Sequence, residues 1–442
     1  MQLETIKEKQ PEKTQVGNYF VANYPPFSAW SAGQVPLALE ALGRPPRPDT
    51  PLGLYLHIPF CRKRCKFCYF RVYTDKNASD VDVYMDAIAR EVALYATQPG
   101  IGGREFEFVY FGGGTPSFLS AQQLQRLIDR INEHWTWSAA REVTFECEPG
   151  TLQKHKLETI RRIGVTRLSL GVEHFDDQVL SLNGRAHKSP EIVRAYDWAR
   201  EVGFDQINID LIAGMLGDTE DKWKAAVARA LELSPDSLTI YQLELPYNTI
   251  ISRQARGEGT EPAIADWATK RRWVDYAFSQ FQAGGYRVSS AYTLVKADSP
   301  NGRFVYRDSV WRGADMVGTG VASFSHFQGV HYQNVDTWEE YVARLQGGAL
   351  PINRALKTTA RQRLIREMIL QLKLGHIDAG YFRDKFGEEI VREFREQWQE
   401  LEREGLARVE GNQVSLTRQG LLRADSLLHR FFEPEYRNIR YT

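Results

Sequence analysis

Short apolar runs alternate with amphipathic stretches along the first half of the chain. The apolar runs are rich in strand-forming residues and lie at 53–58, 106–111, 143–147, 167–172, 206–213 and 237–243. Between them apolar residues recur three or four positions apart, as in Leu124, Leu127, Ile128 and Ile131, which predicts helices with one buried face. Strands separated by helices predict βαβ units and a parallel sheet. The expected fold class is therefore α/β, with six units in a partial (β/α)6 barrel.

The pattern changes after about residue 350. Helical periodicity covers 358–374 and 390–405, and 406–416 reads as two short strands around a Gly411-Asn412 turn. Helices followed by a small hairpin predict a mostly helical, winged-helix-like module. Such modules often bind DNA, but the balanced charge of this chain favours a role in covering the barrel or shaping the substrate site.

Composition narrows the functional classes. The chain of 442 residues carries 56 basic and 56 acidic residues, so neither a nucleic-acid partner nor electrostatic membrane attachment is expected. No apolar run is long enough to span a bilayer. The first ten residues contain no hydrophobic signal core, and the few cysteines suit a reducing compartment, so we expect a cytoplasmic protein.

Three of the four cysteines lie in one short segment, with the spacing C-x3-C-x2-C at Cys61, Cys65 and Cys68. Three thiolates can hold three irons of a cubane cluster and leave the fourth iron open for chemistry. Two alternatives are a structural zinc site that takes His57 as its fourth ligand and a set of unrelated buried cysteines. The fourth cysteine, Cys147, lies in an apolar run and is expected to be a small core residue.

The flanking residues carry a family resemblance. The segment 54–60 (LYLHIPF) leads into the cysteines, Phe67 precedes the last of them, and 112–116 (GGGTP) follows downstream. In this combination the chain resembles the radical S-adenosylmethionine (SAM) enzymes. With 146–149 (ECEP), 171–175 (GVEHF), 208–214 (NIDLIAG), 318–323 (GTGVAS) and 332–334 (YQN), it resembles more narrowly the oxygen-independent coproporphyrinogen III oxidase family.

The resemblance implies a fold, a chemistry and cofactors. It implies a radical SAM barrel at 49–290, preceded by an N-terminal arm at 1–48. A barrel extension on the substrate side at 291–350 and the winged-helix-like module at 351–442 would follow. The implied cofactors are a [4Fe–4S] cluster and SAM, with two SAM molecules in some relatives. Cluster and SAM together would generate a 5′-deoxyadenosyl radical that abstracts a hydrogen atom from the substrate.

The same resemblance assigns roles to individual residues. Cys61, Cys65 and Cys68 would bind the cluster, and Tyr55, Glu146 and Glu173 would be catalytic. Residues implied to contact SAM are Tyr55, Phe67, Gly113, Gly114, Thr115, Glu146, Glu173, Arg185, Asp210, Glu244 and Phe324. Asp210 also stands out without the resemblance, because a carboxylate within the apolar run 207–212 is costly to bury unpaired.

Three functions fit the resemblance. The first is oxidative decarboxylation of a porphyrinogen, as in the family's oxidases. The second is radical SAM methylation, cyclopropanation or haem modification, favoured by Glu173, where the haem-synthesis enzymes carry glutamine, and by an N-terminal arm that keeps Tyr24-Pro25 but lacks their arginine. The third is a haem carrier that uses His174, His187, His326 or His331 as an axial ligand.

The expected partners are a porphyrin-type or other aromatic small molecule and an electron donor such as flavodoxin. Five basic residues surround the cysteines: Arg62, Lys63, Arg64, Lys66 and Arg71. They either partly offset thiolate charge in a solvated loop or form a docking collar for an acidic donor.

Overall fold

The computed structural model describes residues 20–260, 264–299 and 302–437. The expectations about the first ten residues, and the part of the predicted arm before Phe20, lie outside these described residues. Within them, no helix combines the length and the apolar character needed to cross a bilayer.

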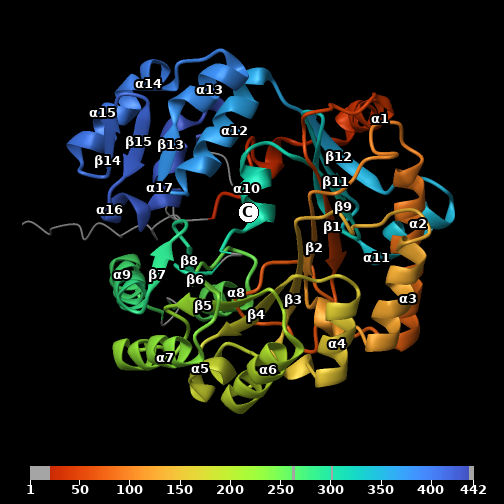
Figure 1. Cartoon of the computed structure of the whole chain (residues 1–442), viewed down its shortest axis with the longest axis horizontal. Coiled ribbons are helices and arrows are strands. Elements are labelled where there is room, and N and C mark those ends of the chain that lie inside the picture. Colours follow the sequence, from red (N-terminus) through yellow and green to blue (C-terminus); the bar gives the residue numbers. More distant parts are fainter. Residues whose placement is uncertain (1–19, 261–263, 300–301, 438–442) are drawn as a thin grey trace, which may run out of the picture.

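A curved sheet of 12 strands forms the centre of the molecule (Figure 1). Its strands, in spatial order, are β12 (Ile352–Lys357), β11 (Val330–Asn334), β10 (Phe324–Phe327), β9 (Asp315–Thr319), β1 (Leu52–Ile58), β2 (Phe108–Gly113), β3 (Glu142–Cys147), β4 (Arg167–Glu173), β5 (Gln206–Ala213), β6 (Ser237–Gln242), β8 (Thr293–Lys296) and β7 (Tyr286–Val288). The strands β1 to β6 are parallel and match the six predicted strands to within two residues at each end. The α/β prediction is therefore confirmed.

The sheet extends further than the six predicted units. A seventh parallel strand, β9, pairs with β1 in the register Leu52↔Asp315, and the antiparallel strands β10, β11 and β12 continue beyond it. At the other side β8 and β7 extend β6 in antiparallel fashion. Among the described residues the edge strands β12 and β7 do not pair with each other, so the barrel is open.

Helices follow the strands and cover the outer side of the sheet (Figure 1). The helices of this part are α1 (Val35–Gly43), α2 (Ala78–Ala96), α3 (Ala121–Ile131), α4 (Lys154–Arg162), α5 (Asp177–Leu182), α6 (Ser189–Val202), α7 (Glu220–Leu233), α8 (Ile250–Glu258), α9 (Trp267–Ala283), α10 (Val305–Trp311) and α11 (Trp338–Gln346). In α3 the apolar stripe Leu124, Leu127, Ile128 and Ile131 is buried as predicted. One large core joins the sheet to most of these helices, whereas Trp311 of α10 belongs to the C-terminal core.

The C-terminal module has its own core and a small sheet. Its elements are α12 (Ala360–Leu372), β13 (His376–Asp378), α13 (Ala379–Phe386), α14 (Ile390–Glu393), α15 (Arg395–Arg403), β14 (Ala407–Glu410), β15 (Gln413–Leu416), α16 (Arg418–Leu421) and α17 (Ala424–Leu428). The predicted hairpin is present as β14–β15, and β13 pairs with it as a third strand. The helix expected at 390–405 was wrong as a single element, because the chain leaves helical geometry at Phe394 and divides it into α14 and α15.

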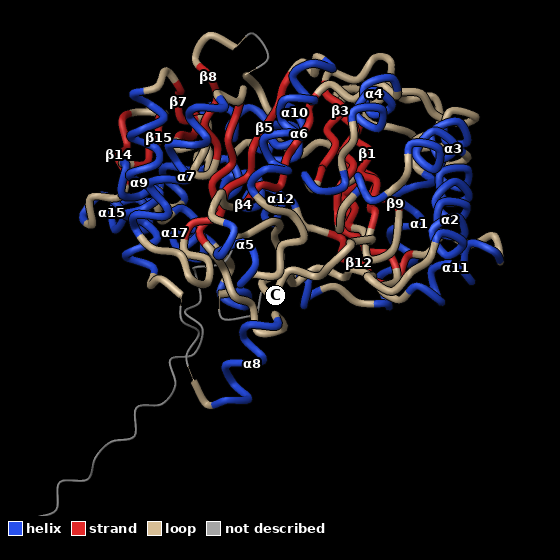
Figure 2. The backbone as a smooth tube through the Cα atoms, turned by 90° about the horizontal axis from the view of Figure 1, so that it is seen from below, coloured by secondary structure: helices blue, strands red, loops and turns tan. Residues whose placement is uncertain are grey.

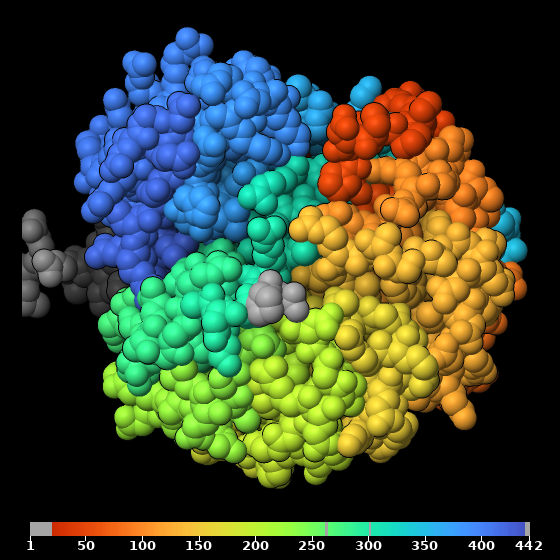
Figure 3. All heavy atoms as spheres, in the orientation of Figure 1, coloured from red at the N-terminus to blue at the C-terminus, as the bar shows by residue number. Residues whose placement is uncertain are grey.

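The C-terminal module packs directly against the barrel (Figure 3). Arg418 Nε lies 2.6 Å from Asp275 Oδ1 on α9. The N-terminal segment, residues 20–34, contacts both the module and the sheet. Val21 and Tyr24 are fully buried in the C-terminal core, and Ser31 pairs with Ala355 of β12. The N-terminal segment therefore contacts both the C-terminal core and the edge of the large sheet.

Candidate functional site

The three-cysteine segment forms an irregular loop just after β1. The Lys66 N–H donates to the carbonyl oxygen of Asn183 at 2.9 Å, and the Cys68 N–H donates to that of Cys65 at 3.1 Å. None of the three cysteines is in a disulfide. Burial raises the pKa of Cys61 to about 11 and that of Cys68 to about 12. Because a thiol must lose its proton to bind a metal, loading this loop would release protons.

The loop fits an iron–sulfur cluster better than a single ion. Within the described residues no three His, Cys, Asp or Glu side chains converge on a single-ion site, so the zinc alternative with His57 is not preformed. In a cubane each thiolate binds a different iron, so the thiols need not point at one atom. Arg64 and Arg185 each keep a buried Nε without a hydrogen-bond partner in the described part of the chain. Such unsatisfied donors beside the loop suit an anionic group.

The glycine loop lies against the entrance of the cysteine loop. Gly113 has φ +114°, and a Cβ there would lie 2.6 Å from the His57 ring. A Cβ at Gly114 would come within 2.8–3.0 Å of the backbone of residues 58–60. Thr115 Oγ1 lies 3.4 Å from Cys61 Sγ. These glycines are thus required for close packing of the two loops, whatever they also contact in a ligand.

Acidic and aromatic side chains line the inner face of the parallel sheet. Tyr55 and Tyr110 face each other across β1 and β2, with stacked rings 5.9 Å apart. Tyr110 Oη donates to Glu146 Oε1 at 2.7 Å, and Ser169 Oγ donates to Asp210 Oδ2 at 3.0 Å. Burial raises the pKa of Glu146 to about 7 and also raises the pKa of Asp210. The face therefore holds carboxyl groups that gain from a cationic partner.

Glu173 and Arg185 connect this face to the cysteine loop. Glu173 ends β4 with φ +65°, which is uncommon for a residue other than glycine, and the β4–β5 register shifts there. Its carboxylate lies 3.6 Å from Arg185 Nη1, which in turn lies 3.2 Å from Cys65 Sγ. Burial raises the pKa of Glu173 to about 7, and Arg185 opposes this shift. Cys61, Cys65, Arg185, Glu173, Glu146 and Asp210 thus lie on adjoining elements at one end of the sheet.

Three further predicted residues make their main contacts outside this group. Glu244 follows β6 and accepts a hydrogen bond from the Phe20 N–H at 2.8 Å, and burial raises its pKa to about 8. Phe324 begins β10 and packs on Phe27, with 4.2 Å between ring centroids. Glu244 and Phe324 therefore both contact the N-terminal segment. Phe67 packs against a small apolar cluster around Met215 and Leu243.

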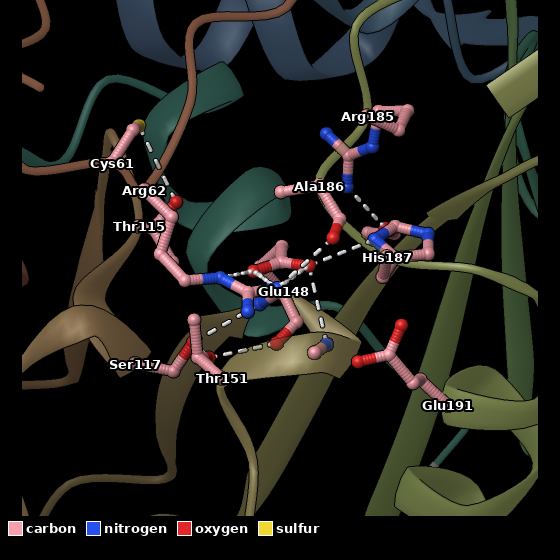
Figure 4. Close-up of polar contacts among 12 residues, drawn as sticks. Cys61, Arg62, Thr115, Ser117, Glu148, Thr151, Arg185, Ala186, His187 and Glu191 are labelled. Carbon is pink, nitrogen blue, oxygen red and sulfur yellow. Dashed lines mark hydrogen bonds and ion pairs between the residues drawn. The ribbon is translucent and has the colours of Figure 1, made fainter. Parts of the chain in front are cut away.

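Sequence reasoning missed a polar network beside the cysteine loop (Figure 4). Arg62 donates two hydrogen bonds to Glu148, from Nε at 3.1 Å and from Nη2 at 3.0 Å. Glu148 also lies 2.9 Å from Nδ1 of His187. The one signal in the sequence is that Glu148 follows a strand end; nothing local shows that it meets Arg62 and His187.

Comparisons with known proteins agree with this architecture. Residues 55–230 match the model of the radical SAM superfamily, and residues 358–423 match the HemN C-terminal domain. The chain is 27% identical to a heme chaperone HemW of Bacillus subtilis, over 85% of this chain and 98% of the relative. It is 28% identical to an oxygen-independent coproporphyrinogen III oxidase of Escherichia coli, over 87% of this chain and 85% of the relative.

The fold has a solved counterpart. The solved structure of coproporphyrinogen III oxidase (HemN) from Escherichia coli superposes with a TM-score of 0.81 and 24% identity, covering 93% of this chain and 96% of that one. The cofactors that follow from the matched domain are a [4Fe–4S] cluster and SAM. This chain thus combines a region that matches the radical SAM superfamily at 55–230 with one that matches the HemN C-terminal domain at 358–423. Over most of its length it is similar to proteins named oxygen-independent coproporphyrinogen III oxidase and heme chaperone HemW.

Proposed function

We propose that this chain is a radical SAM enzyme that decarboxylates propionate side chains of a porphyrinogen, as an oxygen-independent coproporphyrinogen III oxidase does. The observation that carries the proposal is the adjoining placement of the cysteine loop, Arg185 and the acidic inner face at one end of the parallel sheet. A bound cluster would supply the electron for SAM cleavage, and SAM would supply the adenosyl group that takes a hydrogen atom from the substrate.

The chain's own residues take distinct roles in this proposal. Cys61, Cys65 and Cys68 hold the cluster, and Arg185 offers a forked donor to a carboxylate beside Cys65. Glu146 and Asp210 offer carboxylates for an ammonium group or ribose hydroxyls. Tyr55 offers an aromatic face to a sulfonium. The reduced thiols of this loop suit the cytoplasm, where we propose that the protein works.

A haem carrier is the second candidate, because relatives named heme chaperone HemW match the chain as well as the oxidases do. The histidines that a carrier would use as axial ligands speak against it. His174, His187, His326 and His331 are each at most 5% exposed, and each has a polar partner inside the protein. Haem ligation by any of them would require that packing to open.

A different radical reaction is the third candidate, and Glu173 is the residue that favours it. Where the haem-synthesis enzymes resembled here carry a neutral amide, Glu173 places a buried carboxylate next to Arg185. A changed charge at this point alters how a ligand beside the cysteines is held.

One anaerobic experiment separates these candidates. The protein is reconstituted with iron and sulfide, reduced with dithionite and given SAM, with and without coproporphyrinogen III. Chromatography and mass spectrometry then follow 5′-deoxyadenosine and the porphyrins. Deoxyadenosine with loss of carboxyl groups is the expected result. Deoxyadenosine without porphyrin change would redirect the assignment to methylation or haem modification, and no deoxyadenosine at all would favour the carrier.

We propose that the electron donor docks beside the cysteine loop. Only some of the five basic residues around the cysteines are available to bind it. Arg62 is bound to Glu148, Arg64 donates to the Cys68 carbonyl at 3.1 Å, and Arg71 pairs with Asp336 at 3.2 Å. Within the described residues no ion pair holds Lys63 or Lys66. The exposed helix α8 projects from the molecule (Figure 2). It lies beside the cysteine loop, since the Ile251 N–H donates to the Lys66 carbonyl oxygen at 3.2 Å.

Reversing the charge of Lys63 should therefore slow reduction by flavodoxin. We expect Lys63→Glu to lower that rate roughly tenfold at low ionic strength and to leave reduction by dithionite unchanged. The matched control is Lys357→Glu on β12, an exposed lysine on the edge strand. Equal slowing with both reductants, or the same slowing in the control, would rule out docking at this loop. Anaerobic stopped-flow absorbance of the cluster measures both rates.

A further inference from the structure

We propose that Glu148 is a positioning residue that clamps the cysteine loop to the segment carrying Arg185. This inference rests on the proposed function only in taking Cys61, Cys65 and Cys68 as the cluster ligands. Three features carry it: the fixed geometry of Glu148, its forked ion pair with Arg62, and its contact with His187 (Figure 4).

Glu148 is held in place by its own backbone and neighbours. Its N–H donates to Ser117 Oγ at 3.0 Å, and its carbonyl oxygen accepts from Thr151 Oγ1 at 2.7 Å. Its side-chain Oε1 accepts from the Gly150 N–H at 3.1 Å. The residue is only 9% exposed. A carboxylate fixed at this many points is a rigid anchor for whatever binds its remaining lone pairs.

Arg62 binds this anchor from the cysteine loop. It directly follows Cys61, and its two parallel donors form the forked pair with the carboxylate. Such a pair fixes orientation as well as distance, and charge-assisted hydrogen bonds are the strong ones. Arg62 Nη2 also lies 3.4 Å from the carbonyl oxygen of Ala186. One side chain of the cysteine loop thus reaches both Glu148 and the segment after Arg185.

His187 binds the same anchor from the other side. Its Nδ1 lies 2.9 Å from Glu148 Oε1, and its Nε2 lies 3.2 Å from the Val172 carbonyl oxygen. Burial lowers the pKa of His187, which favours a neutral ring, whereas two facing oxygen atoms favour a protonated one. Although burial works against it, His187 and Arg62 hold the pKa of Glu148 below its usual value. The clamp therefore stands on the forked Arg62–Glu148 pair.

The clamp has a consequence for the ligands. His187 lies two residues after Arg185, whose Nη1 contacts Cys65 Sγ. Glu148 therefore links Arg62, which follows Cys61, to the segment that carries Arg185. That arginine contacts Cys65. The loop has no regular secondary structure of its own, so its thiol positions depend on such outside anchors.

The test measures thiol accessibility and needs no turnover. Full-length protein without its cluster is treated with iodoacetamide, and mass spectrometry follows alkylation of each cysteine. We expect Glu148→Gln to raise the rate at Cys61 and Cys65 at least about tenfold, because a forked charged contact is lost. Buried Cys147 serves as the internal reference. The matched control is Asp205→Asn, which removes the Arg161 ion pair elsewhere on the surface.

A double-mutant cycle adds the second requirement. Arg62→Gln should give the same increase, and the double variant should exceed neither single variant, because all three lack the same clamp. Unchanged rates in a folded Glu148→Gln protein, or an equal rise at Cys147, would overturn the proposal. If Glu148→Gln does not fold, Arg62→Gln tests the clamp from the more exposed partner. If the cysteines of the variants become accessible as expected, but the wild-type protein never cleaves SAM, the clamp is supported and the proposed function is rejected.

Discussion

Replacing Cys65 by serine should abolish both the cluster and SAM cleavage. The three cysteines are the thiols of one loop, and each would hold a different iron, so no neighbouring side chain can substitute. Serine supplies an oxygen that suits iron–sulfur chemistry poorly, and it also removes the sulfur that Arg185 contacts at 3.2 Å. We expect the visible absorbance and the bound iron to fall sharply, and deoxyadenosine formation to fall to background.

The chain provides its own control for this experiment. Cys147 is 4% exposed within β3, so Cys147→Ser should keep the cluster and most of the activity. Iron and sulfide analysis after anaerobic reconstitution measures both variants. Full cluster content in Cys65→Ser, or an equal loss in Cys147→Ser, would contradict the assignment of the loop as the cluster site.

Replacing Glu146 by glutamine should weaken SAM binding and flatten its dependence on pH. Burial raises the pKa of Glu146 to about 7, with Tyr110 opposing the shift, so the free protein is partly protonated there near neutral pH. A cationic ammonium group binds the ionised form. Wild-type affinity should therefore increase as the pH rises through about 7. Glutamine removes the charge, and the loss should be about 10- to 100-fold above that pH, the usual range for a hydrogen bond to a charged group.

The free energy of unfolding of the SAM-free protein should change with pH in the opposite direction, falling as the pH rises. A carboxyl group whose folded pKa lies above its unfolded value stabilises the fold at low pH, and that contribution is lost as the pH rises toward about 7. Glu173 and Asp210 interact with Glu146, so the observed midpoint belongs to the set of carboxyl groups.

Equilibrium binding of SAM, measured between about pH 6 and about pH 8.5, checks the prediction. Tyr110→Phe is the informative companion variant, because it removes the donor at 2.7 Å that favours the ionised carboxylate. In Tyr110→Phe the rise of SAM affinity with pH should occur at higher pH and with the same steepness as in the wild type. An affinity and slope in Glu146→Gln equal to the wild type would place the ammonium group elsewhere.

Local patterns predicted the parts of this molecule that local forces determine. The six strands β1 to β6 follow from their apolar composition, and the cysteine spacing alone directs attention to Cys61, Cys65 and Cys68. The side chains of Ser120 and Thr219 cap the first turns of α3 and α7, and such caps act within one turn.

The features that were missed depend on contacts between distant residues. Glu148 meets Arg62 and His187 only after the strands β1 to β4 have assembled, so no window of sequence could show these contacts. Tyr110 gains its role from the register that places it beside Tyr55, and its sequence surroundings look like any strand. The chain leaves helical geometry at Phe394 although helical periodicity covers 390–405, and Phe394 is buried in the C-terminal core beside Phe431.

The position of β9 in the sheet affects how the protein folds during its synthesis. β1 is among the first strands to leave the ribosome, yet the partner on one of its sides ends at Thr319. Until that residue has been synthesised, β1 presents an unpaired edge, the kind of surface that recruits other chains. Expression of residues 55–230 alone would make that exposure permanent. Fragments meant to isolate the cofactor site should therefore extend past Thr319, and slow synthesis between these two strands should favour aggregation.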